Sequence, residues 1–381
     1  MPSLYLHIPF CEKKCIYCDF YSIENLAPME TFLEALHREI DMYAGHAKGT
    51  RFETIFFGGG TPSLLTPQQL ESILAHLYRS YVLTDDPEVT VETNPGTVTS
   101  DSLAAYRSLG VNRLSIGIQS FHDDELRFLG RIHDRTRAIR CVEYAYGAGF
   151  ENVSVDLIYS LPGQTLARWQ ESLRTAVNLS PKHLSAYGLI VEDGTPLARM
   201  VRTRQISPNP PEMEASLYEF TMECMETHGF EHYEVSNYAR RGYRSRHNYA
   251  YWCHDNYLGF GPSAHSFWKH QISQEGHRWW NISNVSNYCS RLKEGRLPRA
   301  SEEILTRDEL ITERIFLGLR SDGLDIKRLE SEFGLEFPSM HRTIINQLVA
   351  DERVTLENET LLRLTSKGYP LCDEISERLM L

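Results

Sequence analysis

Short apolar runs recur along the first half of the chain at regular intervals. Six of them have the length of buried strands, and the segments between them repeat apolar residues with helical spacing. The strand-like runs are residues 4–8, 54–57, 89–93, 113–118, 153–158 and 183–189. Strands that alternate with helices predict a parallel sheet. Six strand–helix units are fewer than the eight of a closed barrel, so we expect an α/β fold with an open, partial (β/α)6 barrel.

The intervening segments support this alternation. Phe32, Leu36 and Ile40 lie on one face of a helix between the first two strands. The next helix is expected to start at Thr66, because Pro67 suits the first helical position and Gln69 completes a capping box. Further helical stripes cover 169–177 and 217–225.

After about residue 201 the pattern changes. A capping box at Thr306 and Glu309 opens a helix, and two more helical patterns cover 326–333 and 339–350. Apolar runs at 354–357 and 361–364 can pair as a hairpin around Asn358. We therefore expect a core at 1–237, an aromatic- and histidine-rich connecting region at 238–300 and a mostly helical, winged-helix-like module at 301–381.

Charge and composition exclude several classes of function. The net charge is −12, and the last 81 residues carry ten Lys and Arg against seventeen Asp and Glu, which would repel nucleic-acid phosphates. No run of 18 apolar residues and no signal sequence is present, so we expect a cytoplasmic protein. Eight cysteines in that compartment favour metal binding over disulfides.

Three of these cysteines, Cys11, Cys15 and Cys18, form a CxxxCxxC sequence directly after the first predicted strand. A structural zinc site needs four ligands, and no Cys or His follows Cys18 closely. Three thiolates can hold a [4Fe–4S] cluster and leave one iron open to a ligand. A zinc site completed by a distant histidine, or cysteines without a ligand, are the alternatives.

Polar or glycine-rich residues also follow the other predicted strands. Gly58-Gly59-Gly60-Thr61 follows the second strand, and Glu92, Gln119, Asp156 and Tyr187 lie at or near the ends of later ones. In barrels of parallel strands the active site lies at this edge. The sequence therefore predicts that the cysteines and these residues share one site.

The CxxxCxxC sequence, preceded by Tyr-Leu-His-Ile-Pro-Phe, resembles the signature of the radical S-adenosylmethionine (radical SAM) superfamily. It is similar to the branch that contains oxygen-independent coproporphyrinogen III dehydrogenase and the HemW heme chaperones. The resemblance implies a [4Fe–4S] cluster on Cys11, Cys15 and Cys18, with SAM on its open iron. It also implies a reducing partner such as a flavodoxin or ferredoxin. The sequence assigns no catalytic residue.

The resemblance also implies a set of SAM contacts. Gly59, Gly60 and Thr61 match the motif that approaches the SAM amino group, where the absence of a Cβ lets backbone come close. An arginine suits the methionine carboxylate and acidic groups suit ribose hydroxyls. The matching residues for these roles and for the pocket lining are Glu92, Gln119, Arg131, Asp156, Tyr5, Tyr17, Tyr187 and Ile190.

A second block stands out between His228 and His277, which holds seven of the fifteen histidines, and four of the five tryptophans lie between Trp252 and Trp280. It can be an aromatic core, or the wall of a heme pocket with an axial histidine. One stretch resembles the HNxxYW motif of the heme chaperones, which implies heme contacts at His247, Asn248, Tyr251 and Trp252. His247 is the first choice of axial ligand.

Two sequence differences distinguish this chain from the dehydrogenases of the branch. The dehydrogenase has a further cysteine two positions after the third, where this chain has Phe20, and an N-terminal extension where this chain has three residues. Both favour a heme chaperone that delivers heme to respiratory enzymes. The alternative is the dehydrogenase, which converts coproporphyrinogen III propionates to vinyl groups in heme biosynthesis. A non-catalytic zinc protein is a third alternative. We further expect a homodimer and transient contact with the inner face of the membrane.

Overall fold

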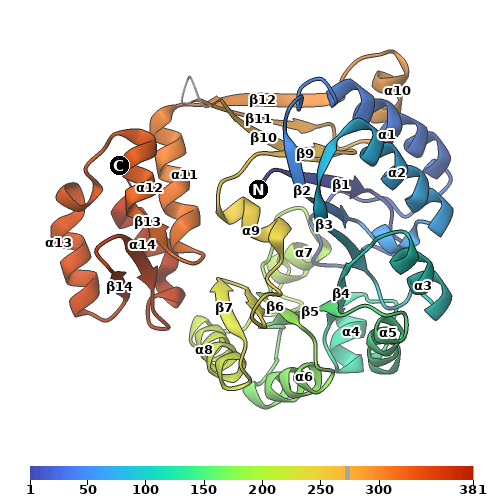
Figure 1. The fold of residues 1–381 in the computed structure, drawn as a ribbon. Coiled ribbons are helices and arrows are strands. Elements are labelled where there is room, and N and C mark those ends of the chain that lie inside the picture. Colours follow the sequence, from blue (N-terminus) through green and yellow to red (C-terminus); the bar gives the residue numbers. More distant parts are fainter. Residues whose placement is uncertain (271–274, 381) are drawn as a thin grey trace.

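The computed structural model describes residues 1–270 and 275–380, in which one large curved sheet lies beside a small C-terminal unit (Figure 1). The described part of this sheet has twelve strands in the order β12-β11-β10-β9-β1-β2-β3-β4-β5-β6-β8-β7. Its central strands β1 to β6 are parallel. They span Ser3–Ile8 (β1), Arg51–Gly59 (β2), Val82–Thr93 (β3), Arg113–Gln119 (β4), Asn152–Tyr159 (β5) and His183–Gly188 (β6). The predicted α/β fold with an open barrel core is confirmed.

Helices cover the outer side of the parallel strands (Figure 1). Phe32, Leu36 and Ile40 are fully buried, as their spacing predicts. The predicted capping box is present, because Thr66 accepts the N–H of Gln69 and Gln69 accepts the N–H of Thr66. The helices are α1 (Met29–Tyr43), α2 (Pro67–Ser80), α3 (Ser100–Ser108), α4 (Asp123–Leu129), α5 (Arg135–Gly147), α6 (Leu166–Asn178), α7 (Pro196–Arg202) and α8 (Pro211–Thr227).

The aromatic and histidine-rich region extends the same sheet. β9 (Tyr257–Phe260) pairs in parallel with β1, and β10 (His265–His270), β11 (Glu275–Asn281) and β12 (Arg299–Leu305) continue antiparallel. At the far end, β8 (Asn237–Ala239) and β7 (Glu231–Glu234) pair antiparallel beyond β6. The expected boundaries after residues 237 and 300 therefore fall inside strands, and the three-part division of the chain stays a prediction.

A buried carboxylate fastens this second half of the sheet to α1. Glu39 accepts hydrogen bonds from the Tyr288 hydroxyl (2.6 Å), the Asn281 amide (2.6 Å) and the Gly261 N–H (2.8 Å). Burial raises the pKa of Glu39 to about 7. Tyr288 lies on α10 (Val285–Lys293), which packs on α1. One acidic side chain thus fixes the turn after β9 against the start of the barrel.

The C-terminal unit contains α11 (Arg307–Leu319), α12 (Ile326–Phe333), α13 (Phe337–Ala350) and α14 (Cys372–Leu379). β13 (Leu324–Asp325), β14 (Val354–Glu357) and β15 (Leu361–Leu364) form a three-stranded sheet. The predicted hairpin is present, and its turn residues Asn358 and Glu359 have φ of 50° and 59°. Among the described residues, no helix combines the length and apolar character needed to cross a bilayer.

Candidate functional site

The cysteine loop follows β1 at the carboxyl edge of the parallel strands. Its base is closed because the Cys11 N–H donates to the Ile23 carbonyl (3.0 Å) and the Ile23 N–H donates to Pro9 (2.9 Å). Cys11 and Cys15 are buried, and Cys18 is partly exposed. Backbone hydrogen bonds therefore hold both ends of the loop, and the thiols of Cys11 and Cys15 point into the protein.

Two helix termini hold the middle of this loop. The Ile16 N–H donates to the carbonyl of Leu129 at the end of α4 (3.2 Å), and the Leu197 N–H of α7 donates to the Ile16 carbonyl (2.9 Å). These helices come from the connections after β4 and β6. Loops of distant strands thus position the cysteines.

The three thiols share one environment. Burial raises the pKa of Cys18 to about 11, and the thiols of Cys15 and Cys11 contribute to that rise. The Thr61 hydroxyl donates to the Cys11 Sγ (3.5 Å), and Arg131 Nη1 donates to the Cys15 Sγ (3.4 Å). A hydroxyl donor and a guanidinium thus lie against two of the three sulfurs.

The number of thiols on this loop bears on which metal centre it could hold. In the described ranges, no group of three His, Cys, Asp or Glu side chains is arranged to hold one metal ion. A zinc–sulfur bond of about 2.3 Å requires all sulfur ligands to converge on one point. A [4Fe–4S] cluster takes each thiolate on a different iron and so accepts a wider triangle. Cys11, Cys15 and Cys18 supply three thiols on one loop, which is a donor set that such a cluster can take.

The glycine segment at the end of β2 lies directly against the start of the cysteine loop. The Gly60 N–H donates to the Ile8 carbonyl (2.9 Å), and the Thr61 N–H donates to the Phe10 carbonyl (2.7 Å). A Cβ at Gly60 would lie 2.6 Å from the Phe10 oxygen. Only glycine fits this contact, which leaves backbone groups of the segment close to the cysteines.

The end of β4 presents Gln119 from a strained backbone. The register with β5 shifts between Gly117 and Gln119, and Gln119 has φ of 72°. Such bulges redirect a side chain, and positive φ in a non-glycine residue is costly and concentrates at functional sites. Arg131 lies beside it, where its Nη2 donates to the Gly117 carbonyl (2.6 Å).

Arg131 retains unused donor capacity. Its Nε is buried and has no hydrogen-bond partner among the described residues. Buried polar groups are almost always paired, so an unpaired guanidinium nitrogen indicates a missing acceptor. A ligand carboxylate is the acceptor that an arginine fork matches best. This environment fits the methionine carboxylate of SAM.

Asp156 on β5 is held by three serine hydroxyls. Ser154 (3.0 Å) and Ser185 (2.9 Å) donate to its Oδ1, and Ser115 donates to Oδ2 (2.9 Å) and more weakly to Oδ1 (3.2 Å). Oδ2 therefore has a lone pair available for a ligand hydroxyl. Burial, and then the charge of Asp156, raises the pKa of the neighbouring Glu92 to about 8.

The aromatic and apolar residues predicted to contact SAM lie at different depths in the protein. Tyr5 is turned into the barrel, where its hydroxyl contacts His7 Nδ1 (3.2 Å). Tyr17 forms a side-chain hydrogen bond with Cys15. Tyr187 and Ile190 are 40% and 67% exposed, so they lie at the rim. The structure thus gathers the cysteines and most predicted SAM contacts at one edge, with Ile190 the most solvent-exposed of the SAM set.

The HNxxYW stretch forms the short helix α9 (Arg246–Trp252), which packs against β2. His247 is only 1% exposed and stacks on Phe56 with ring centroids 4.7 Å apart. Its Nδ1 contacts the Thr54 hydroxyl (2.7 Å) and its Nε2 contacts the Tyr251 hydroxyl (3.0 Å). Both ring nitrogens are therefore occupied, and heme ligation by His247 requires one of these bonds to break.

The predicted heme and SAM residues are neighbours, which the sequence did not indicate. The ring of Tyr5 lies 6.2 Å from that of His247. Burial lowers the pKa of His247 to about 3, so its imidazole is neutral. Asn248 donates its N–H to the capping Ser245 (3.3 Å), and Trp252 is partly exposed at the end of the helix. α9 thus forms the floor beneath the candidate SAM pocket.

Several residues of this site were not predicted. His7 donates to the Tyr21 carbonyl (2.7 Å) and stabilises the cysteine loop, and Glu88 accepts the N–H groups of Arg246 and His247 (both 3.1 Å). Ser115, Ser154 and Ser185 were also missed. Alternation along strands could have found His7 and Ser154, because residues two apart share a face with Tyr5 and Asp156.

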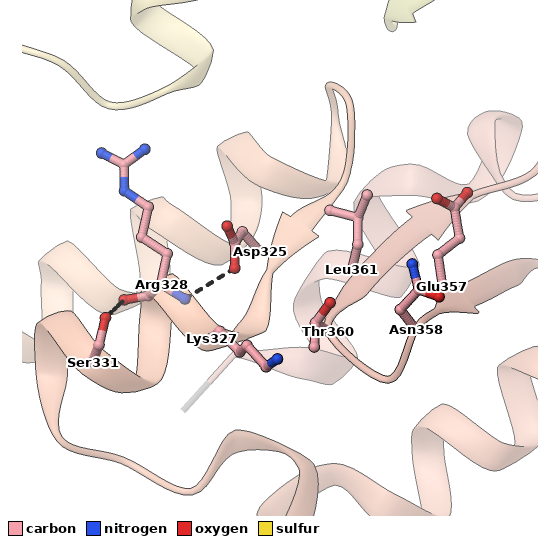
Figure 2. A pocket seen from close by; sticks show the side chains of 8 residues that line it. All are labelled: Asp325, Lys327, Arg328, Ser331, Glu357, Asn358, Thr360 and Leu361. Carbon is pink, nitrogen blue, oxygen red and sulfur yellow. Dashed lines mark hydrogen bonds between the residues drawn. The ribbon is translucent and has the colours of Figure 1, made fainter.

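A pocket of about 580 Å³ lies elsewhere, on the C-terminal unit. Figure 2 shows that α12 and the β14–β15 hairpin line it, with Lys327, Arg328 and Glu357 among the polar side chains. Asp325 accepts the Arg328 N–H (2.9 Å) and so caps α12. None of the predicted site residues lines this pocket, so it is separate from the candidate site.

Comparisons with known proteins agree with this geometry. The chain matches the model of the radical SAM superfamily over residues 5–176 and that of the HemN C-terminal domain over residues 305–371. It is 36% identical to the heme chaperone HemW of Bacillus subtilis over 98% of each chain. It is 32% identical to the HemW of Lactococcus lactis, over 100% of this chain and 97% of that protein.

The structure resembles that of coproporphyrinogen III oxidase (HemN) from Escherichia coli, a radical SAM enzyme. The TM-score is 0.83 at 25% sequence identity, over 99% of this chain and 89% of that one. The superfamily resemblance read from the CxxxCxxC loop is thereby confirmed. The chain belongs to the radical SAM superfamily and, within it, to the HemW family.

Proposed function

We propose that this protein is a heme chaperone that holds a [4Fe–4S] cluster and SAM and delivers heme to respiratory enzymes. The observation that carries the proposal is its full-length similarity to HemW proteins, 36% identity over 98% of both chains. Phe20 supports it, because the dehydrogenase branch has a further cysteine at that position. The side chain of Phe20 is 62% exposed.

In this proposal Cys11, Cys15 and Cys18 bind three irons of the cluster and SAM occupies the fourth. When bound and reduced, the cluster supplies an electron that can cleave a carbon–sulfur bond of SAM. The chain's own groups orient the ligand. The Gly59–Thr61 backbone approaches the amino group, Arg131 pairs with the carboxylate, and Asp156 accepts from the ribose.

Heme is proposed to bind at α9, with His247 as its axial ligand. Support comes from the HNxxYW match and from the aromatic rings around this histidine. Breaking the Tyr251 hydroxyl contact would free Nε2 for iron while Nδ1 keeps its bond to Thr54. A hydrogen bond at the second nitrogen is the usual support for a histidine ligand. We further propose a flavodoxin or ferredoxin as electron donor, a homodimer, and action in the cytoplasm with transient visits to the membrane.

The dehydrogenase reaction separates the two candidate functions. Anaerobically reconstituted protein, supplied with SAM and a reductant, is expected not to convert coproporphyrinogen III to protoporphyrinogen IX. Porphyrin products are measured after oxidation by fluorescence, with the Escherichia coli oxidase as the positive control in the same mixture. Turnover comparable to that control would replace the chaperone proposal with the dehydrogenase function.

A further inference from the structure

His183, at the start of β6, lies wholly inside the barrel and is not among the predicted ligand contacts. Its Nδ1 contacts the Ser154 hydroxyl (2.8 Å), and its Nε2 contacts the Tyr233 hydroxyl (2.7 Å). Burial, together with the nearby guanidinium of Arg113, lowers the pKa of His183 well below its usual value. The ring is therefore neutral, with one nitrogen donating and the other accepting.

The direction of these hydrogen bonds follows from Asp156. The Ser154 hydroxyl donates to Asp156 Oδ1 (3.0 Å), so its hydrogen points to that oxygen. The oxygen of Ser154 then accepts from the Nδ1–H of His183. Nε2 carries no hydrogen, so it accepts from the Tyr233 hydroxyl. All three hydrogen bonds therefore point the same way: Tyr233 donates to His183, His183 to Ser154, and Ser154 to Asp156.

Tyr233, the first donor in this series of hydrogen bonds, lies beside α9, the helix with the HNxxYW motif. Tyr233 is fully buried, and the Arg244 guanidinium lies 5.5 Å from the centre of its ring. Its phenol also has a backbone hydrogen bond with Ser245, the residue that caps α9. The phenol that orients His183 is therefore held by residues next to the first turn of α9.

The bonds determine which oxygen of Asp156 faces a ligand. Ser154 and Ser185 both donate to Oδ1, whereas among the described residues only Ser115 donates to Oδ2. Without the Nδ1–H of His183, the Ser154 oxygen would lose its donor, and the serine side chain could adopt a rotamer that no longer reaches Asp156. The carboxylate would lose a donor on Oδ1, and its orientation would no longer be fixed.

We infer that His183 is a positioning residue of the SAM site, which fixes Ser154 as a donor to Asp156 and so presents the Asp156 Oδ2 to the ribose hydroxyls. The inference rests on the proposed function, because it requires Asp156 to bind SAM. It assigns a role to a side chain that does not touch the ligand.

The test measures SAM affinity of cluster-loaded protein by anaerobic calorimetric titration. His183→Leu should raise the dissociation constant about tenfold, the loss expected for one oriented hydrogen bond. His183→Asn, whose amide can donate to Ser154 in place of the ring, should stay within about threefold of wild type. Iron content and the cluster absorption should be unchanged in both variants, and His341→Leu, at a buried histidine of α13, is the matched control.

A double-mutant cycle separates positioning from general destabilisation. Ser154→Ala should weaken SAM binding at least as much as His183→Leu does, and the double variant should be no weaker than Ser154→Ala alone. Additive losses, or equal losses in the Asn and Leu variants, would overturn the inference. If His183→Leu does not fold, the role of His183 is still tested by the SAM affinities of His183→Asn and Ser154→Ala.

Asp156→Asn distinguishes this inference from the function on which it rests. Loss of SAM binding in that variant, with wild-type affinity in His183→Leu, would remove the role of His183 and leave the SAM site in place. Unchanged affinity in Asp156→Asn would instead contradict the proposed ribose contact itself.

Discussion

Replacement of Cys15 by alanine is expected to abolish the iron–sulfur cluster. Cys15 is buried, its Sγ accepts a hydrogen bond from Arg131 (3.4 Å), and its loop is held by α4 and α7. With only two of three thiolates left, no ligand set for a [4Fe–4S] cluster remains. Iron analysis of anaerobically reconstituted protein should fall from about four atoms per chain to near zero, with loss of the brown chromophore.

Cys141→Ala provides the matched control. Cys141 is also buried, but it lies on α5 and packs in the hydrophobic core. Its loss should lower stability and leave the iron content unchanged. Full iron in the Cys15 variant, or zinc in place of iron in the wild-type protein, would contradict the cluster assignment.

Gly60→Ala is expected to lower the affinity for SAM at least a hundredfold, or about 2.7 kcal/mol. The new Cβ would meet three backbone atoms, the nearest being the Phe10 oxygen at 2.6 Å, and none of them is a flexible side chain. The segment after β2 must therefore move away from the cysteine loop. That movement would break the bonds of Gly60 to Ile8 and of Thr61 to Phe10, and displace the groups proposed to hold the SAM amino end.

The measurement is calorimetric titration of cluster-loaded protein with SAM. Gly147→Ala is the control, because this glycine lies at the end of α5 and a Cβ there would meet no atom within 4 Å. It should bind SAM as the wild type does. Wild-type affinity in the Gly60 variant would show that this segment does not shape the ligand site.

The parallel half of the fold was readable from the sequence because each element carried its own local signal. Strands β1 to β6 are runs of apolar residues, and α2 begins at an explicit capping box at Thr66. The strands that extend this sheet, β7 to β12, were not recognised, because β9 has only four residues including Gly259 and β12 contains Glu302 and Glu303. Their pairing depends on neighbours far along the chain, which no local pattern records.

The residues of the candidate site also fall into those that the sequence predicted and those that it could not. The cysteines and the glycine segment could be located because a motif and a strand end mark them. His183 and Glu88 could not, because their role appears only when β5, β6 and α9 are folded against one another. The burial of His247 is also a tertiary property, since Thr54 and Phe56 of β2 cover its ring.

An anaerobic titration of the protein with hemin tests the account most directly. A Soret band distinct from that of free hemin should grow to saturation near one heme per chain. It should be strongly weakened in His247→Ala and weakened less in Thr54→Val, which removes the Nδ1 partner but keeps the imidazole. Circular dichroism checks that both variants fold. A wild-type protein that leaves the hemin spectrum unchanged would contradict the heme-chaperone function.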